Sequence, residues 1–189
     1  MARPSATDFL HNMRFHVVVV PPASGTPLPF LDGGSRTVTS TPAGFMSVSA
    51  PDMQIQSVMY KEGTWVYERK FPGEVSMGGA IQMQRGVARN DSSFWAWIRT
   101  VAEGTGEYRV DLDIKHFHRD QALSVAPPVT TNKTDLALDN PARVYHVFEC
   151  YPTNHGVNTS GFDATNGEIS IMSLDCDYEH FQVEEKAAA

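Results

Sequence analysis

Alternation of apolar and polar side chains in several separate segments is the feature that most limits how this chain can fold. Residues 53–59, 81–85 and 110–115 each contain apolar residues that alternate with mostly polar ones. This period of two is that of an extended strand with one face in water. We expect residues 81–85 to be the hairpin partner of residues 53–59. Residues 65–77, which contain a Pro-Gly pair and are followed by a Gly-Gly pair, are expected to form a long loop between them.

Further strands are predicted elsewhere in the chain. Residues 14–20 and 144–151 are rich in β-branched and aromatic residues, which favour extended backbone. The last strand is expected at residues 168–181, where Ile169 and Ile171 share a face but Leu174 and Cys176 fall one residue out of phase. A β-bulge near Met172 and Ser173 would restore the register.

Helical signals are sparse. Residues 5–12 are compatible with a short helix. The stronger signal begins at the capping residues 90–92 and ends at Gly104. Its apolar stripe, spaced as on one helix face, consists of Phe94, Trp97, Ile98 and Val101, whereas Trp95 points away from it.

A single helix among six or seven strands predicts a mainly β fold. We expect an orthogonal β-sandwich or partly open barrel with one flanking α-helix. The length of 189 residues fits a single domain spanning residues 1–189. Residues 119–143, rich in Pro, Thr, Asn and Asp, are predicted to form a loop insertion within it.

Charge and hydropathy exclude several classes of function. A net charge of -7 argues against a surface that grips nucleic acid, because such binding needs clustered Lys and Arg. Apolar runs such as Val17 to Val20 are far shorter than the ~20 residues of a membrane helix. The first residues lack a secretory signal pattern, so we expect synthesis and assembly in a cytoplasm. Cys150 and Cys176 are accordingly expected to be two buried thiols.

No residue pattern indicates an enzyme or a cofactor site. His116 and His118 lie on one side of a strand, as metal ligands can, but no further ligands follow at recognisable offsets. The pairs Asp111 with Asp113 and Asp175 with Asp177 alternate with apolar residues, which indicates the wet face of a strand rather than acid–base chemistry. Neither a nucleophile elbow nor a phosphate-binding glycine loop occurs. We therefore expect no catalytic residues, no cofactor and no metal.

An ordered set of short motifs is more specific than composition. Residues 9–17 resemble the opening helix and first strand of the tail-tube family of contractile-tailed phages and phage-tail-like injection systems. Residues 60–63, 69–73 and 81–91 resemble its central block, residues 94–97 its aromatic helix, and residues 168–171 and 174–179 its closing strand. The resemblance covers most of the chain. Two segments depart from the family pattern: residues 48–51, where Pro51 forbids one ladder hydrogen bond, and the longer excursion at 119–143.

The resemblance implies a structural subunit that stacks as hexameric rings into a hollow conduit inside a contractile sheath. Each subunit is expected to contribute two hairpins to a β-barrel that continues between subunits. The implied partners are further copies of the chain, the sheath protein, and baseplate and tail-terminator proteins. DNA or protein cargo would pass through without specific binding, and no membrane is involved. The particle would be a virion tail or a dedicated injection particle, assembled in the bacterial cytoplasm.

Within that frame, the polar faces of the predicted hairpins are candidates for the lumen, and the predicted loop is a candidate for contact between rings. The lumen candidates are Gln54, Gln56, Gln82, Gln84, Asp111 and Asp113. The inter-ring candidates are Arg69, Lys70, Phe71, Pro72 and Gly73. From the strand pattern alone, a ligand-binding β-sandwich such as a carbohydrate-binding module is the alternative.

Overall fold

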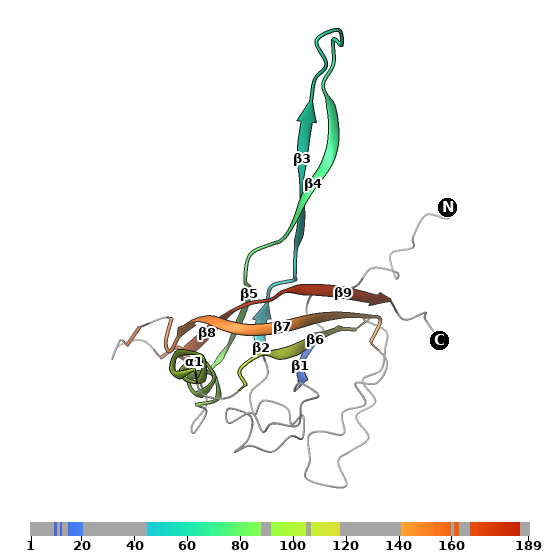
Figure 1. Cartoon of the computed structure of the whole chain (residues 1–189). Helices are drawn as coiled ribbons and strands as arrows, with labels where there is room; N and C mark the ends of the chain where they lie inside the picture. Colours follow the sequence, from blue (N-terminus) through green and yellow to red (C-terminus); the bar gives the residue numbers. More distant parts are fainter. Residues whose placement is uncertain are drawn as a thin grey trace.

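The computed structural model describes residues 10, 12, 15–20, 45–87, 92–104, 107–117, 141–159, 161–162 and 167–185. Most of the predicted helix at residues 5–12 and most of the predicted insertion at 119–143 lie outside these residues. In chain order the elements are β1 (Phe15–Val20), β2 (Phe45–Val48), β3 (Met53–Tyr60), β4 (Arg69–Met77), β5 (Ile81–Gly86), α1 (Ser93–Glu103), β6 (Val110–His116), β7 (Arg143–Gly156), β8 (Ile171–Asp177) and β9 (His180–Glu185) (Figure 1).

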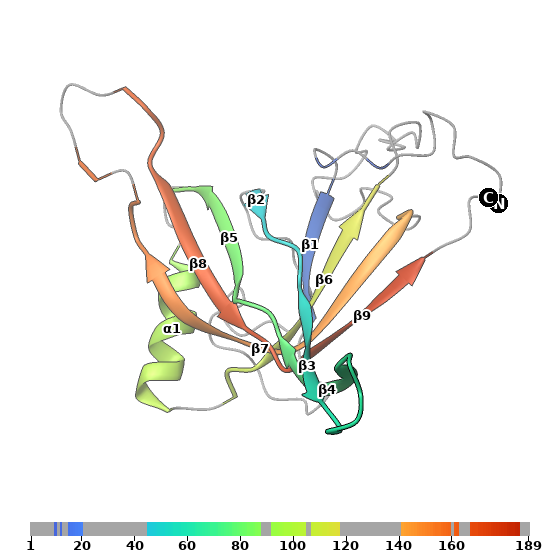
Figure 2. The same cartoon turned by 90° about the horizontal axis from the view of Figure 1, so that it is seen from above.

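The strands form an open antiparallel sheet that divides into two halves at β7. The strand path runs β1-β6-β7-β8-β5-β2, and β9 also pairs with β7. Residues 143–148 of β7 pair with β9, and residues 143–150 face β6, whereas residues 151–156 pair with β8. Figure 2 shows β5 and β8 diverging from β1, β6 and β9, with β7 passing between the two groups. The expected mainly β, partly open architecture with one flanking helix is confirmed.

A β-bulge allows β7 to belong to both halves. Leu112 faces Val147 but Val110 faces Cys150, so β7 carries an extra residue at this point. Glu149 adopts a φ of 57°, a left-handed conformation that few residues with a side chain take up. Its backbone N–H donates to Oδ1 of Asp111 over 3.0 Å. The bulge bends the strand, as bulges at sheet corners do, and redirects β7 toward β8.

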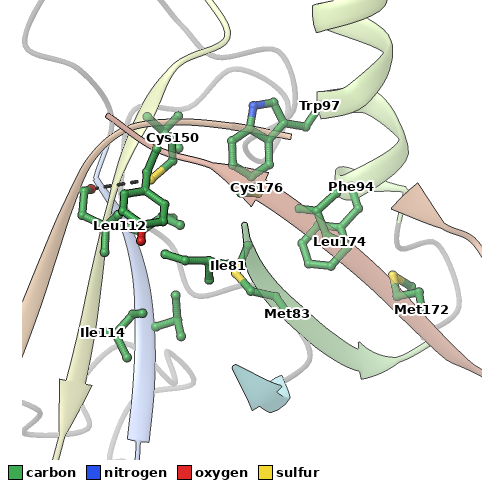
Figure 3. Packing of buried hydrophobic residues seen from close by; sticks show 14 residues of the cluster. Ile81, Met83, Phe94, Trp97, Leu112, Ile114, Cys150, Met172, Leu174 and Cys176 are labelled. Carbon is green, nitrogen blue, oxygen red and sulfur yellow. Dashed lines mark hydrogen bonds between the residues drawn. The ribbon is translucent and has the colours of Figure 1, made fainter. Parts of the chain in front are cut away.

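Both halves of the sheet and the helix contribute to one hydrophobic core (Figure 3). Strict alternation places the buried side chains of β5, β6 and β8 on the core side. Burying one such aliphatic or aromatic side chain contributes roughly 1.5–3 kcal/mol. The core consists of Val17, Ile81, Met83, Phe94, Trp97, Val110, Leu112, Ile114, Val147, Cys150, Met172, Leu174, Cys176 and Tyr178. Both cysteines are free thiols here, as expected, and burial raises the pKa of Cys150 to about 12.

Helix α1 agrees with its prediction. Phe94 and Trp97 are buried, Ile98 and Val101 are half-buried, and Trp95 is exposed. The indole N–H of Trp97 donates to the carbonyl of Tyr108 over 2.7 Å. Gly104 ends the helix in the left-handed conformation (φ 64°), which glycine adopts without strain.

Two predictions about strand pairing are wrong. The partner of β3 is β4, not residues 81–85, which instead pair with β2 and β8. Residues 69–77 are therefore a strand rather than part of a loop. Pro72 is compatible with that strand because β4 is an edge strand, where a missing N–H costs little. Only residues 61–68 form the connecting tip.

The bulge predicted in the closing strand is also wrong. β8 pairs with β5 in an unbroken register, and Met172, Leu174 and Cys176 are buried in regular alternation. Ile169 precedes the strand and is 76% exposed, so it does not belong to the core face. The irregularity lies in β7, between Pro152 and Asn154. A separate strand, β9, follows the turn after Tyr178.

Candidate assembly surfaces

A hairpin of exposed apolar side chains projects from the body of the protein. β3 and β4 form a separate two-stranded sheet that extends away from the larger one (Figure 1). Among the described residues, ten of the 17 large hydrophobic side chains that are exposed lie on this hairpin: Met53, Ile55, Val58, Met59, Tyr60, Trp65, Val66, Tyr67, Phe71 and Val75. An isolated two-stranded hairpin is marginally stable in water. Such a concentration of apolar surface indicates a protein interaction site.

The second face of the hairpin becomes apolar toward the tip. Near its base, Met53 and Ile55 share a face with Met77 and Val75, their cross-strand partners. Ile55 and Val58 are an odd number of residues apart in β3, so they point to opposite faces. An extra residue in β4 between Pro72 and Val75 keeps the two strands in phase across this change. The hairpin therefore offers apolar surface on one face near the base and, because Met59 continues that face, on both faces near the tip.

The residues predicted to contact the next ring are brought together in the distal half of this hairpin. Arg69, Lys70, Phe71, Pro72 and Gly73 open β4. The Arg69 guanidinium lies 4.0 Å from the ring centroid of Trp65, which positions the tip against the strand. A Cβ atom at Gly73 would lie 2.8 Å from Cγ2 of Val58, so a larger residue here would displace β3.

The six lumen candidates are distributed over three surfaces of one subunit. Gln54 and Gln56 lie on the hairpin, in β3. Gln82 and Gln84 lie on the outer face of β5, opposite Asp175 and Ser173 of β8. Asp111 and Asp113 lie on the outer face of β6. The structure thus brings together the members of each pair but not the three pairs.

Around Asp113, the outer face of the β1-β6-β7-β9 half carries a polar cluster that sequence reasoning missed. In His146 of β7, Nδ1 lies 2.7 Å from Oδ1 of Asp113, and Nε2 lies 3.2 Å from Oε2 of Glu184 in β9. Burial lowers the pKa of His146, but the two carboxylate hydrogen bonds outweigh it, and the pKa is raised above its ordinary value. His146 and Glu184 alternate with the apolar residues Tyr145, Val147 and Val183, which was the available signal.

We expect two histidines of this face, His16 of β1 and His146 of β7, to have pKa values on opposite sides of the ordinary value of 6.5. The carboxylates raise the pKa of His146, whereas burial, aided by the charge of Lys115, lowers that of His16. A raised pKa contributes stability that is fully present below pH 6.5 and is lost as the pH rises through the folded-state value. NMR titration of the imidazole resonances measures both histidines in one sample.

The variant His146→Gln isolates the stability effect. The difference in unfolding free energy between the wild type and this variant should be largest below pH 6.5 and should shrink as the pH rises. A difference that grows with pH would contradict the assignment.

Within the described parts of the chain, no group of three or more His, Cys, Asp or Glu residues is arranged to hold a metal ion. The same residues contain no helix long and apolar enough to cross a membrane. His118, one of the two histidines considered above as metal ligands, lies outside the described residues.

An open antiparallel body with a projecting apolar hairpin defines a structural subunit that assembles with other proteins. The sequence pattern of the T4-like virus tail tube protein gp19 family matches residues 12–182. The chain belongs to this family and is a structural subunit of an inner tube, as the sequence resemblance predicted. No curated protein matches the chain.

Solved structures share the fold. A chain of the sheath-tube complex of an extracellular contractile injection system (PVC) in the extended state has a TM-score of 0.65 and 17% identity, covering 96% of this chain and 95% of that one. A chain of the PVC sheath/tube terminator has a TM-score of 0.65 and 18% identity, covering 95% and 99%. A chain of the 6-fold symmetrised baseplate of the anti-feeding prophage has a TM-score of 0.62 and 14% identity, covering 98% of each. The carbohydrate-binding alternative finds no support among these comparisons.

Proposed function

We propose that the protein forms hexameric rings that stack into the inner conduit of a contractile phage tail or injection particle. The projecting apolar hairpin is the observation that carries this proposal, because its exposed surface needs a partner protein to cover it. The structural relatives support the arrangement: one belongs to a sheath-tube complex and another to a 6-fold symmetrised baseplate. Sheath, baseplate and terminator proteins are the corresponding partners, and assembly would take place in the bacterial cytoplasm.

A continuous barrel between subunits follows from the open edges of one half of the sheet. β1 and β9 are the outer strands of the β1-β6-β7-β9 half and are six residues long each. Because neighbouring strands alternate in direction across this half, β9 of one copy would lie antiparallel to β1 of the next. Such pairing would remove two exposed edges, which otherwise invite uncontrolled association.

In this arrangement Asp111 and Asp113 line the channel. Their face is opposite the core, and it also carries Glu184 and Lys115, so its formal charge is negative. A negative lining repels DNA or acidic cargo and so favours sliding over binding. Gln82 and Gln84, on the other half of the sheet, would line the channel only if that half formed the barrel instead.

We propose that the distal half of the hairpin, from Arg69 to Gly73, makes the contact between rings. Its apolar residues Val58, Tyr60 and Phe71 share one face, and the tip residues Trp65, Val66 and Tyr67 are exposed as well. The face near the base is then free to meet a different copy.

Electron microscopy of the purified protein tests the proposal. Negative staining should show rings or tubes at modest concentration, whereas a ligand-binding module would remain a monomer in sedimentation. A cryo-EM map of the tube then shows which residues line the channel, and Asp111 and Asp113 should be among them. Finding them packed between subunits or against the sheath would overturn the assignment of the lumen even if tubes form.

A further inference from the structure

The base of the hairpin is joined to the body through an unusual set of hydrogen bonds to one residue. The hydroxyl of Tyr178 accepts from the backbone N–H of Asp52 over 2.9 Å and donates to the carbonyl of the same residue over 2.8 Å. That carbonyl also accepts from the N–H of Gly78 over 2.7 Å, which closes the two strands of the hairpin at their base.

In the described part of the chain, no strand pairing connects the base of the hairpin to the larger sheet. The β2–β5 ladder ends with Ser49, whose N–H donates to the Gln82 carbonyl and whose Oγ accepts from the Gln82 N–H, both over 2.9 Å. Pro51 has no N–H to extend the pairing. The chain therefore leaves the body after Ser49. The next backbone groups that the body binds are the N–H and carbonyl of Asp52, through the hydroxyl of Tyr178.

Tyr178 is well placed to fix the direction of the hairpin. Its ring is 8% exposed and belongs to the hydrophobic core, and it packs edge-on against Phe181 of β9 with ring centroids 6.2 Å apart. The residue lies between β8 and β9, and the N–H of the following Glu179 donates to the carbonyl of Phe148 in β7 over 3.2 Å. The ring that carries the hydroxyl is thus positioned by its contact with β9, and the adjacent backbone by a hydrogen bond to β7.

A small change in the direction of the hairpin at its base produces a large displacement of its tip. At about 3.3 Å per residue, the eight residues of β3 span roughly 26 Å, so a tilt of about 10° at the base moves the far end by roughly 5 Å. A displacement of that size would separate apolar side chains that must approach within about 4.5 Å to be in contact.

We propose that Tyr178 is a positioning residue for assembly, whose hydroxyl holds the backbone of Asp52 and thereby sets the direction in which the β3–β4 hairpin leaves the body. This inference rests on the proposed tube function. Its partner surface is a second copy of this chain, whose binding requires the hairpin in one orientation.

Tyr178→Phe removes the hydroxyl and keeps the buried ring. The matched control is Tyr151→Phe, on the neighbouring strand, because the structure shows no hydrogen bond from the Tyr151 hydroxyl to any described residue. We expect Tyr178→Phe to raise the critical concentration for tube growth about tenfold or more, the effect of losing about 1.4 kcal/mol of orientation free energy. Tyr151→Phe should assemble as the wild type does.

A distance measurement separates positioning from a merely structural role. Spin labels at Glu68→Cys, on the tip, and Ala102→Cys, on the helix, report hairpin orientation in the unassembled subunit, and Ala102→Cys with Gln182→Cys reports the body. In the Tyr178→Phe background the distance distribution from tip to helix should broaden or shift, while that within the body stays unchanged. The native thiols are buried and should not take up the label.

Gly78→Ala tests the same joint from the other strand. A Cβ atom at Gly78 would lie 2.6 Å from Cβ of Asp52, which forces Asp52 away from its place without touching Tyr178. This variant should show the same broadened tip distance and the same loss of assembly.

The outcomes distinguish the inference from the function on which it rests. If Tyr178→Phe matches Tyr151→Phe in both critical concentration and tip distance, the positioning role is wrong while the tube stands. If the wild type itself never forms tubes, the proposed function fails, and the tip-to-helix distances of the subunit still decide whether Tyr178 orients the hairpin.

Discussion

Replacing residues 53–77 with a short Gly-Ser link should yield a folded subunit that forms no tubes. The two ends of the deletion are already adjacent, since the N–H of Gly78 donates to the carbonyl of Asp52 over 2.7 Å. All residues of β3 are exposed, and of the removed apolar side chains only Met77 packs against the core. The free energy of unfolding should therefore fall by only about 1 kcal/mol. Sedimentation velocity and negative-stain microscopy measure assembly, and near-UV circular dichroism reports the fold.

A pair of point variants tests the same hairpin without removing it. Ile55→Lys places a charge on the apolar face near the base, whereas Gln54→Lys places the same side chain one position earlier, on the opposite face. Burying an unpaired lysine in an interface is strongly unfavourable, so Ile55→Lys should prevent tube growth and Gln54→Lys should reduce it far less. Tubes of ordinary length from either the deletion or Ile55→Lys would contradict an assembly role for the hairpin.

The elements of the fold were largely predictable from the sequence, but their pairing was not. The alternation of Val110, Leu112 and Ile114 identified β6, and the stripe containing Phe94 and Trp97 identified α1, because both patterns reflect burial against a single core. β3 and β5 show the same alternation, yet only β5 lies on the core. Periodicity shows only that one face of a strand differs from the other, and the apolar side chains of β3 are exposed rather than packed on the core.

For the candidate surfaces too, some features could be predicted from the sequence and others could not. Residues 69–73 do lie together, at the start of β4, but they form a strand, whereas the sequence interpretation placed Pro72 and Gly73 in a loop. Edge position overrode their preference for turns. Tyr178 was visible only as part of a closing-strand motif, because a hydrogen bond to a residue 126 positions away leaves no local pattern.

Arg85 is buried in the core, and its substitution should cause a large loss of stability. It shares the inward face of β5 with Ile81 and Met83 and is 0% exposed. Its guanidinium lies 3.8 Å from the ring centroid of Phe94, and Nη2 donates to Oγ of Ser93 over 2.7 Å. Nε approaches Sδ of Met172 at 3.5 Å. One side chain thus joins β5 to β8 and to the first turn of α1.

Arg85→Ala should lower the free energy of unfolding by about 3 kcal/mol or more, because it leaves a cavity and removes the hydrogen bond that the guanidinium donates to the Ser93 hydroxyl. Arg85→Lys should lose less, since it keeps the charge but not the planar group that stacks on Phe94. Gln84→Ala, one position away on the outer face, is the control and should change stability by about 0.5 kcal/mol or less.

Urea denaturation gives these free energies, provided that assembly does not add its own stabilisation, which would mask the differences. The subunit without residues 53–77 is therefore the appropriate host, once it is shown to fold. A loss of under about 1 kcal/mol for Arg85→Ala, a value typical of an ordinary substitution, would contradict the role of Arg85 in holding the helix to the sheet. Because domains of this kind are stable by only about 5–15 kcal/mol, the expected loss would also reduce the fraction of subunits available for tube growth.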